Sequence, residues 1–379
     1  MTSRDIVEDL ARWWREGRTV GVATVVSTFR SAPRPPGAAL AAGPDGEVIG
    51  SVSGGCVEGA AYETACEVAR TGRPTLERYG VSDDDLFAIG LTCGGTLEIF
   101  VEAVSRETFP EFGIVAADIA AGRSVAVATV IEARDPEVVG CRLVVHEDDA
   151  LGSCGSDRLD AVLVEDVRGA LASGCTGVLS YGADGERAGQ GLRVFVAVSA
   201  PPPRLIVFGA IDFAAALGRA AGFLGFRVTV CDARGLFATT RRFPYAEEVV
   251  VDWPHRYLAG EVAAGRIDAR TAIAVLTHDP KFDVPLLEVA LRLPDLGYLG
   301  AMGSRRTHRD RLTRLRAAGV ADAELARLHS PIGLDLGART PQETAISIVA
   351  EIISVSQGGT GKPLGAEEGP IHRLSMDRS

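Results

Sequence analysis

The first half of the chain contains an internal repeat, and no other feature of the 379-residue sequence restricts its fold as strongly. The clearest match is EGRTVGVATVV at 16–26 with AGRSVAVATVI at 121–131, which align position for position. Two more segments recur in the same order: 50–72 aligns without a gap on 152–174, and 96–104 resembles 191–199. We therefore expect two copies of one structural unit, over 16–104 and 121–199.

Each copy is predicted to form two strands, a Gly- and Ser-rich turn, a helix and a closing strand. Apolar residues alternate at 20–26 and 97–101, which indicates strands. From Val57 to Val68 the apolar residues recur at helical spacing, and Gly72 follows as a helix end.

The second half begins with the proline-rich linker SAPPPR at 199–204, the best domain boundary in the sequence. A strand, a glycine turn, an Ala-rich helix and a second strand follow it, which is how a Rossmann βαβ unit opens. Further strands are expected at 248–251, 271–277 and 296–302. The predicted fold class is α/β: an N-terminal α/β domain with an internal duplication, then a Rossmann-like domain with a mainly parallel sheet. The predicted boundaries are 1–200 for the first domain, 201–357 for the second, and 358–379 for a flexible tail.

Composition excludes several classes of protein. The 39 Lys and Arg residues face 50 Asp and Glu residues, and the net charge of −11 disfavours nucleic acid or an anionic membrane as the main partner. No apolar run approaches the roughly 18 residues of a membrane span, and residues 1–17 predict an amphipathic helix rather than a signal peptide. Seven cysteines without secretory context indicate reduced thiols and a cytoplasmic location.

Comparing the two copies separates residues that the scaffold needs from residues that it does not. Where the first copy has Gly54, Gly55 and Cys56, the second has 156–158, which read Ser, Asp and Arg. The trio Cys93, Gly94 and Gly95 likewise faces Ala, Gly and Gln at 188–190. Neither thiol is needed for the shared fold, although small buried hydrophobes are the common alternative for such cysteines.

Cys56 is expected where a strand gives way to a helix, and the helix dipole there favours thiolate. The N–H groups around Gly54 and Gly55 could form an anion cradle. Cys93 would approach Cys56 if the strand 96–102 neighbours 47–52. Two such thiols suit a soft metal or a sulfur-transfer step.

Two charged residues flank this chemistry. Glu58 could accept a proton or simply complement the first helical turn. Arg34 lies in the proline-rich loop SAPRPPGAAL, where a rigid guanidinium could bind phosphate, although a solvated arginine is the commoner case.

The Rossmann fingerprint of the second half is incomplete, because only Gly209 and Ala214 fit Gly-x-Gly-x-x-Gly/Ala. Ile211 stands where the second glycine would admit a pyrophosphate, and Asp212 adds negative charge. Asp232 has the spacing of a ribose ligand. His278 and Asp279 end a strand of the expected sheet, a common position for site residues.

Together these segments resemble the XdhC/CoxI family, accessory proteins of xanthine dehydrogenase and carbon monoxide dehydrogenase. The motifs that carry the resemblance are GSVSGGCVEG (50–59), GLTCGGTLEIFVE (90–102), RFP (242–244), THD (277–279), GYLGAMGSRR (297–306) and PIGLDLGARTPQETAISIVAEII (331–353). They span nearly the whole chain.

The resemblance implies a chaperone that binds the molybdenum cofactor, assists its sulfuration and inserts it into a xanthine dehydrogenase-type molybdoenzyme. It also implies a cysteine desulfurase as sulfur donor and a homodimer. The implied cofactor-facing thiols and metal ligands are Cys56 and Cys93. Further cofactor contacts are implied at Arg34, Ser53, Gly54, Gly55, Glu58, Gly94 and Gly95.

Two other readings remain open from the residues alone. One is an NAD(P)-dependent oxidoreductase, with Gly209 in the nucleotide turn, Asp232 on the ribose, and His278 as acid or base beside Asp279. The other is a scaffold without a small-molecule ligand, which leaves the difference between the two copies unexplained.

Overall fold

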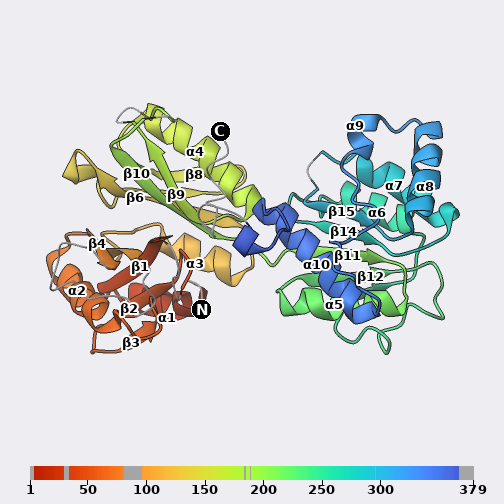
Figure 1. The fold of residues 1–379 in the computed structure, drawn as a ribbon. Helices are drawn as coiled ribbons and strands as arrows, with labels where there is room; N and C mark the ends of the chain where they lie inside the picture. The colour runs from red at the N-terminus through yellow and green to blue at the C-terminus, as the bar shows by residue number, and fades with distance from the viewer. Residues whose placement is uncertain are drawn as a thin grey trace. The chain divides into compact units, whose positions relative to one another are not determined.

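The computed structural model describes residues 4–29, 34–80, 96–182, 185–187, 189–294 and 296–366. These residues divide after Pro201 into two compact units (Figure 1). No helix among the described residues has the length and apolar character needed to cross a membrane.

The first unit contains two antiparallel sheets with the same strand order, β3-β2-β1-β5-β4 and β8-β7-β6-β10-β9. The first sheet consists of β1 (Val20–Phe29), β2 (Ala39–Ala42), β3 (Val48–Gly50), β4 (Thr75–Gly80) and β5 (Thr96–Val104). The second consists of β6 (Val125–Ala133), β7 (Arg142–Val145), β8 (Ala150–Ser153), β9 (Gly177–Tyr181) and β10 (Leu192–Ser199). Matching order in the two sheets is what the sequence repeat predicts.

Each copy has more elements than the apolar pattern predicted. The first copy contains the helix α2 (Glu58–Thr71), and the second contains α4 (Asp157–Ser173) and a short 3-10 turn at Pro136–Val138. The helices α1 (Arg4–Arg15) and α3 (Phe112–Ala120) directly precede the two copies. The strand β4 went unpredicted because its sequence, TLERYG, is largely polar, as suits the edge of a sheet. Gly72 ends α2 in the left-handed conformation, with φ of 71°.

The two copies meet through equivalent positions. Val26 and Ile131 occupy matching places in the repeat, as do Phe100 and Phe195, and the four side chains form one buried cluster. Glu98 and Arg193 also match. Arg193 Nη2 lies 2.5 Å from Glu98 Oε2, so one copy supplies the carboxylate and the other the guanidinium. The copies therefore pack about an approximate twofold relation.

The second unit contains a wholly parallel sheet of order β13-β12-β11-β14-β15. Its strands are β11 (Arg204–Phe208), β12 (Arg227–Cys231), β13 (Glu248–Val250), β14 (Ala272–Val275) and β15 (Tyr298–Ala301). Its helices are α5 (Asp212–Phe223), α6 (Pro254–Ala263), α7 (Pro280–Leu291), α8 (Arg305–Ala317), α9 (Asp322–Leu325) and α10 (Pro341–Gln357), followed by a 3-10 turn at Leu364–Ala366. The predicted α/β fold class with a mainly parallel C-terminal sheet is confirmed.

Because successive side chains of each strand point to opposite faces, this sheet has a hydrophobic core on both faces. Leu205 and Val207 of β11 pack with α5 and α10, whereas Ile206 and Phe208 pack with α6, α7, α8 and α9. Figure 1 shows α5 and α10 on one side of the sheet and α7 and α8 on the other. All five strands end at the same edge, where ligands of such sheets bind.

Candidate functional site

The loop between β3 and α2 is where the two copies of the first unit diverge. In the second copy α4 begins at Asp157, but α2 begins at Glu58, whose aligned partner is Asp160. The first helical turn is thus opened in the first copy. Gly54 and Gly55 have φ of 77° and 131°, which a helix cannot accommodate.

Opening this turn exposes Cys56. A Cβ added at Gly54 or Gly55 would meet nothing within 4 Å, so the space over the loop is open. The Cys56 N–H donates to Ser53 Oγ at 3.0 Å, and so does the N–H of Val57. The loop therefore presents a fixed backbone and an accessible thiol.

The predicted anion cradle is filled by the protein itself. Five donors converge on the carboxylate of Glu58: Ser51 Oγ at 2.9 Å, Ser53 N at 2.9 Å, Gly54 N at 2.7 Å, Gly55 N at 2.7 Å, and Ser53 Oγ. Burial alone would raise the pKa of this carboxyl, but the hydrogen bonds outweigh burial and lower the pKa to about 2. The prediction that these N–H groups await an external phosphate therefore needs correction, because Glu58 already accepts from them.

The second copy retains a simpler form of this contact. Asp160, aligned with Glu58, accepts a hydrogen bond from the N–H of Cys154 at 2.7 Å. A carboxylate that closes the loop is thus common to both copies, whereas the exposed thiol belongs to the first copy alone. Of the two roles open to Glu58, the structure supports a structural acceptor that holds the loop.

Cys93, Gly94 and Gly95 lie outside the described residues. Cys93 was expected near Cys56 on the condition that the strand 96–102 neighbours 47–52, and this condition is not met. In the sheet, β2 and β1 separate β3 from β5. The described ends of the intervening segment are Gly80 and Thr96, which pair with each other.

The strand β1 also ends beside Thr96, because Phe29 pairs with Thr96. The strand β3 runs in the direction of β1, since both are antiparallel to β2. The Cys56 loop therefore leaves the sheet at the same end of the strands as Gly80 and Thr96. Arg34 is half-buried in the segment that leads into β2 at this end of the strands.

The glycine turn of the second unit is also closed by its own residues. Asp232, the predicted ribose ligand, is only 2% exposed and accepts from the N–H of Ala210 at 2.7 Å. Arg234 donates to both of its oxygens, at 2.9 and 2.7 Å. Although burial opposes the change, these contacts lower the pKa of Asp232. A ribose hydroxyl would have to displace Arg234 to reach this carboxylate.

Gly209 has φ of 112°, and a Cβ there would lie 3.0 Å from the backbone nitrogen of Thr277. This glycine is therefore required for the turn and for close packing, whether or not a nucleotide binds. Ile211 is the N-cap residue of α5 and makes no side-chain cap hydrogen bond.

Both units match families of known proteins. Residues 13–80 and 118–182 match the XdhC and CoxI family, and residues 205–352 match the XdhC Rossmann domain. The chain belongs to the XdhC and CoxI family. It is 29% identical over 334 residues to a protein of Bacillus subtilis named as a probable xanthine dehydrogenase subunit, covering 88% of this chain and 92% of that one.

A second relative is the molybdenum cofactor insertion chaperone PaoD of Escherichia coli, with 29% identity over 339 residues, 89% of this chain and 84% of PaoD. A solved structure titled as a xanthine dehydrogenase from Bacillus halodurans has a TM-score of 0.63 and 25% identity, and covers 97% of this chain and 98% of its own. The family fold thus extends over both units.

The neighbouring residues His278 and Asp279 have different surroundings from each other. His278 is exposed and lies three residues beyond the end of β14, which stops at Val275. Asp279 is the N-cap of α7, accepting from the N–H of Lys281 at 3.1 Å, and it also forms an ion pair with the Lys281 ammonium. The Asp279 carboxylate therefore has a structural role.

The sequence reasoning missed a buried ion pair close to these residues. Arg311 Nη2 lies 3.0 Å from Asp283 Oδ2, and both residues are 4% exposed. Thr277 donates to the same carboxylate. The one available signal was that Arg311 precedes the buried Leu315 by four residues, which places it on the inner face of α8 rather than among the solvated arginines.

Among the other described cysteines, Cys66 is exposed on α2. Cys154 and Cys231 are buried, and burial raises the pKa of each thiol to about 12. Cys141 and Cys175 are half-buried.

These differences predict the order of thiol modification. Iodoacetamide at pH 8 should alkylate Cys56 and Cys66 at least about 100-fold faster than Cys154 and Cys231, because only thiolate reacts and access is limited by burial. Peptide mapping by mass spectrometry over time measures each site separately. Labelling of Cys231 at the rate of Cys56 in the folded protein would contradict the described burial.

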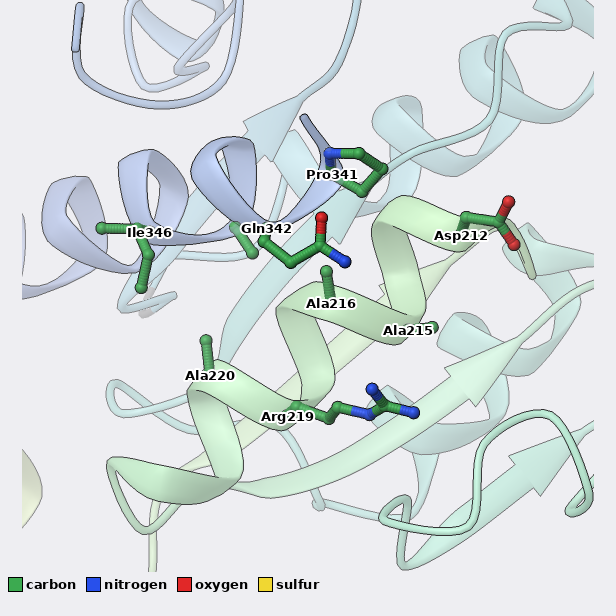
Figure 2. A pocket seen from close by; sticks show the side chains of 9 residues that line it. Asp212, Ala215, Ala216, Arg219, Ala220, Pro341, Gln342 and Ile346 are labelled. Carbon is green, nitrogen blue, oxygen red and sulfur yellow. The ribbon is translucent and has the colours of Figure 1, made fainter. Parts of the chain in front are cut away.

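The second unit also has an open groove of about 500 Å³ between α5 and α10. Figure 2 shows Ala216 and Ala220 of α5 facing Gln342 and Ile346 of α10. Pro341 lies within the family motif at 331–353, and Thr340 caps α10 in a capping box with Glu343. Because Asp212 lines the same groove as Pro341 and Gln342, the glycine turn and this family motif lie close together.

Proposed function

We propose that this family member binds the molybdenum cofactor and delivers it to a xanthine dehydrogenase-type enzyme. The names of its relatives support this role, since one is a molybdenum cofactor insertion chaperone and another a probable xanthine dehydrogenase subunit. The observation that carries the proposal is the exposed Cys56. It lies in a loop before α2, whereas the aligned residue of the second copy already belongs to α4.

The residues at this loop fit part of the cofactor. An exposed sulfur is a suitable ligand for a soft metal, and the open space over Gly54 and Gly55 lets a bulky group approach the backbone. When bound, the cofactor supplies a molybdenum centre that thiolate sulfur can ligate. Among the described residues no three His, Cys, Asp or Glu side chains form a metal site, so Cys56 would act with Cys93 or with the cofactor's own ligands.

The loop N–H groups do not fit the pterin phosphate, because Glu58 occupies them. In the proposed function Glu58, Ser53, Gly54 and Gly55 therefore fix the position of Cys56, and the phosphate is held by other groups. Arg34 is proposed for this contact, because its loop approaches the same end of the strands.

The finer parts of the proposal concern partners. A cysteine desulfurase would supply sulfur for the terminal ligand of the cofactor, and the Rossmann unit would dock the receiving enzyme. The active form is proposed to be a homodimer. Oxidoreductase activity with NAD(P) is the weaker alternative, because Ile211 stands at the second glycine position and Asp232 is held by Arg234.

Mutation of Cys56 to Ser tests the proposal. The full chain is purified from a host that makes the cofactor, and molybdenum and pterin are measured per protein chain. We expect Cys56→Ser to lose at least about 90% of the bound molybdenum, because a hydroxyl is a poor ligand for a soft metal. Cys66→Ser is the matched control, since Cys66 is also exposed but lies within α2. Equal molybdenum in Cys56→Ser and wild type would refute the assignment.

A further inference from the structure

The first unit has a partly open cavity of about 120 Å³ between its two sheets. Equivalent residues of the two copies line it: Val22 with Val127, Thr24 with Thr129, and Phe100 with Phe195. Val22 packs with the cluster that includes α1 and α3, whereas its neighbour Ala23 packs with α2. The cavity is therefore on the opposite face of the first sheet from α2 and the Cys56 loop.

The strand register explains why no large side chain fills this space. Thr24 pairs with Ala39 and Thr129 pairs with Arg142, so Ala39 and Arg142 hold equivalent positions. By the same reasoning Val22 pairs with Glu102 and Val127 with Ala197, so Glu102 is equivalent to Ala197.

On one side of the twofold relation these positions are filled by an ion pair. Arg142 donates to Glu102 and, at 2.8 Å, to the carbonyl of Thr108, and its guanidinium lies 4.6 Å from the centre of the Phe109 ring. On the other side the same two positions carry only the methyl groups of Ala39 and Ala197. Both alanines line the cavity, and Glu102 of the ion pair also borders it, so the cavity includes the twin of the space that the ion pair fills.

The chemistry of the walls defines what the cavity can hold. Ile6, Leu10, Phe112 and Val115, from α1 and α3, contribute buried apolar surface. The Ser199 hydroxyl, also in the wall, is buried and has no hydrogen-bond partner among the described residues. A buried hydroxyl without a partner is unfavourable, so a ligand with one polar atom is better suited than a pure hydrocarbon.

We propose that this cavity is a binding site for one small single-ring molecule that carries a hydroxyl group, such as a phenol. An enclosed apolar cavity of about 150 Å³ is known to bind benzene, so a space of roughly this size can hold a single ring. The ring occupies the space beside Ala39 and Ala197, and the ligand hydroxyl bonds to Ser199 Oγ. The site is independent of cofactor binding, because it is on the other face of the sheet from Cys56.

Methyl-group NMR of the full chain, with phenol and benzene as the probes, tests this site. We expect phenol to shift the methyl signals of Leu10, Val22 and Val127 with saturation. Ala197→Leu fills the cavity and should abolish these shifts, and Ala39→Leu should do the same. Ala69→Leu is the control, since Ala69 is half-buried on α2 and does not line the cavity.

A milder variant keeps the test decisive if the leucine variants fail to fold. Ser199→Ala removes only the hydroxyl and should weaken phenol about fivefold while leaving benzene unchanged. Absence of saturable shifts with either probe, or phenol binding that persists in folded Ala197→Leu, would overturn the proposal. A cavity that holds only water would give the first of these results. Cys56→Ser should bind phenol as wild type does, so this outcome is separate from that of the cofactor experiment.

Discussion

Replacing Arg311 with leucine should destabilise the Rossmann unit by about 3–5 kcal/mol, because it leaves the Asp283 carboxylate buried without its cation. Arg311 also donates to Ser330 Oγ at 3.0 Å and to the Met302 carbonyl at 2.8 Å, and these contacts are lost as well. Urea unfolding followed by hydrogen exchange of peptides from α7 and α8 measures the change within this unit.

The effect should depend on pH. Burial raises the pKa of Asp283, and removal of Arg311 takes away a contact that lowers it. An acid whose folded pKa exceeds its unfolded pKa loses stability as pH rises through that interval, so the variant should be weaker at pH 7 than at pH 4.

Two further variants show whether the buried charge is the cause. Asp283→Leu with Arg311→Leu removes both charges and should be less destabilised than Arg311→Leu alone. Arg314→Leu, on the exposed side of the same helix, should change stability by less than about 0.5 kcal/mol. A double variant that is weaker than the single one would show that the hydrogen bonds outweigh the unpaired charge.

Replacing Glu58 with glutamine should destabilise the Cys56 loop by about 2–3 kcal/mol, because an amide cannot accept from all five converging donors. The amide nitrogen would face donors such as the Gly55 N–H. Hydrogen exchange of a peptide spanning residues 51–60 should become faster, and this measures the loop directly.

This effect should disappear in acid. The pKa of Glu58 is about 2 in the folded protein, below its ordinary value of 4.5. The stability that it contributes is complete above about pH 4.5 and is lost as the pH falls toward 2, so wild type and Glu58→Gln should converge over that range. Glu67→Gln, an exposed carboxylate on the same helix, is the control. A difference that stays constant from pH 7 to pH 2.5 would contradict the role assigned to Glu58.

The exposed thiol shows what an internal repeat can reveal. The gap-free match of 50–72 with 152–174 separated the shared helix from Cys56, and the structure explains the difference by the later start of α2. The same match also aligned Glu58 with Asp160. Reading that pair as a shared structural carboxylate would have predicted the loop closure from the sequence.

Asp232 and Arg311 show where sequence patterns mislead. Asp232 has the spacing of a ribose ligand, but Arg234, two residues later, folds back onto it. Arg311 belongs to a run of arginines that looks solvated, although its side chain is buried against Asp283. The partner of Arg311 is set by the packing of α8 against α7, whereas the partner of Asp232 lies only two residues along the chain.

The sequence by itself determined the duplicated α/β unit, the mainly parallel sheet that follows, and the divergence of the two copies at Cys56. These features are recorded locally, because the alternation of apolar residues and the positions of glycines depend on neighbours along the chain. Only the tertiary structure decided that Glu58 fills the N–H groups of its loop, that two strands separate β3 from β5, and that a cavity remains where Ala39 and Ala197 replace an ion pair. Each of these depends on which segments meet in space, and strand order and cross-copy packing leave no periodic trace in the sequence.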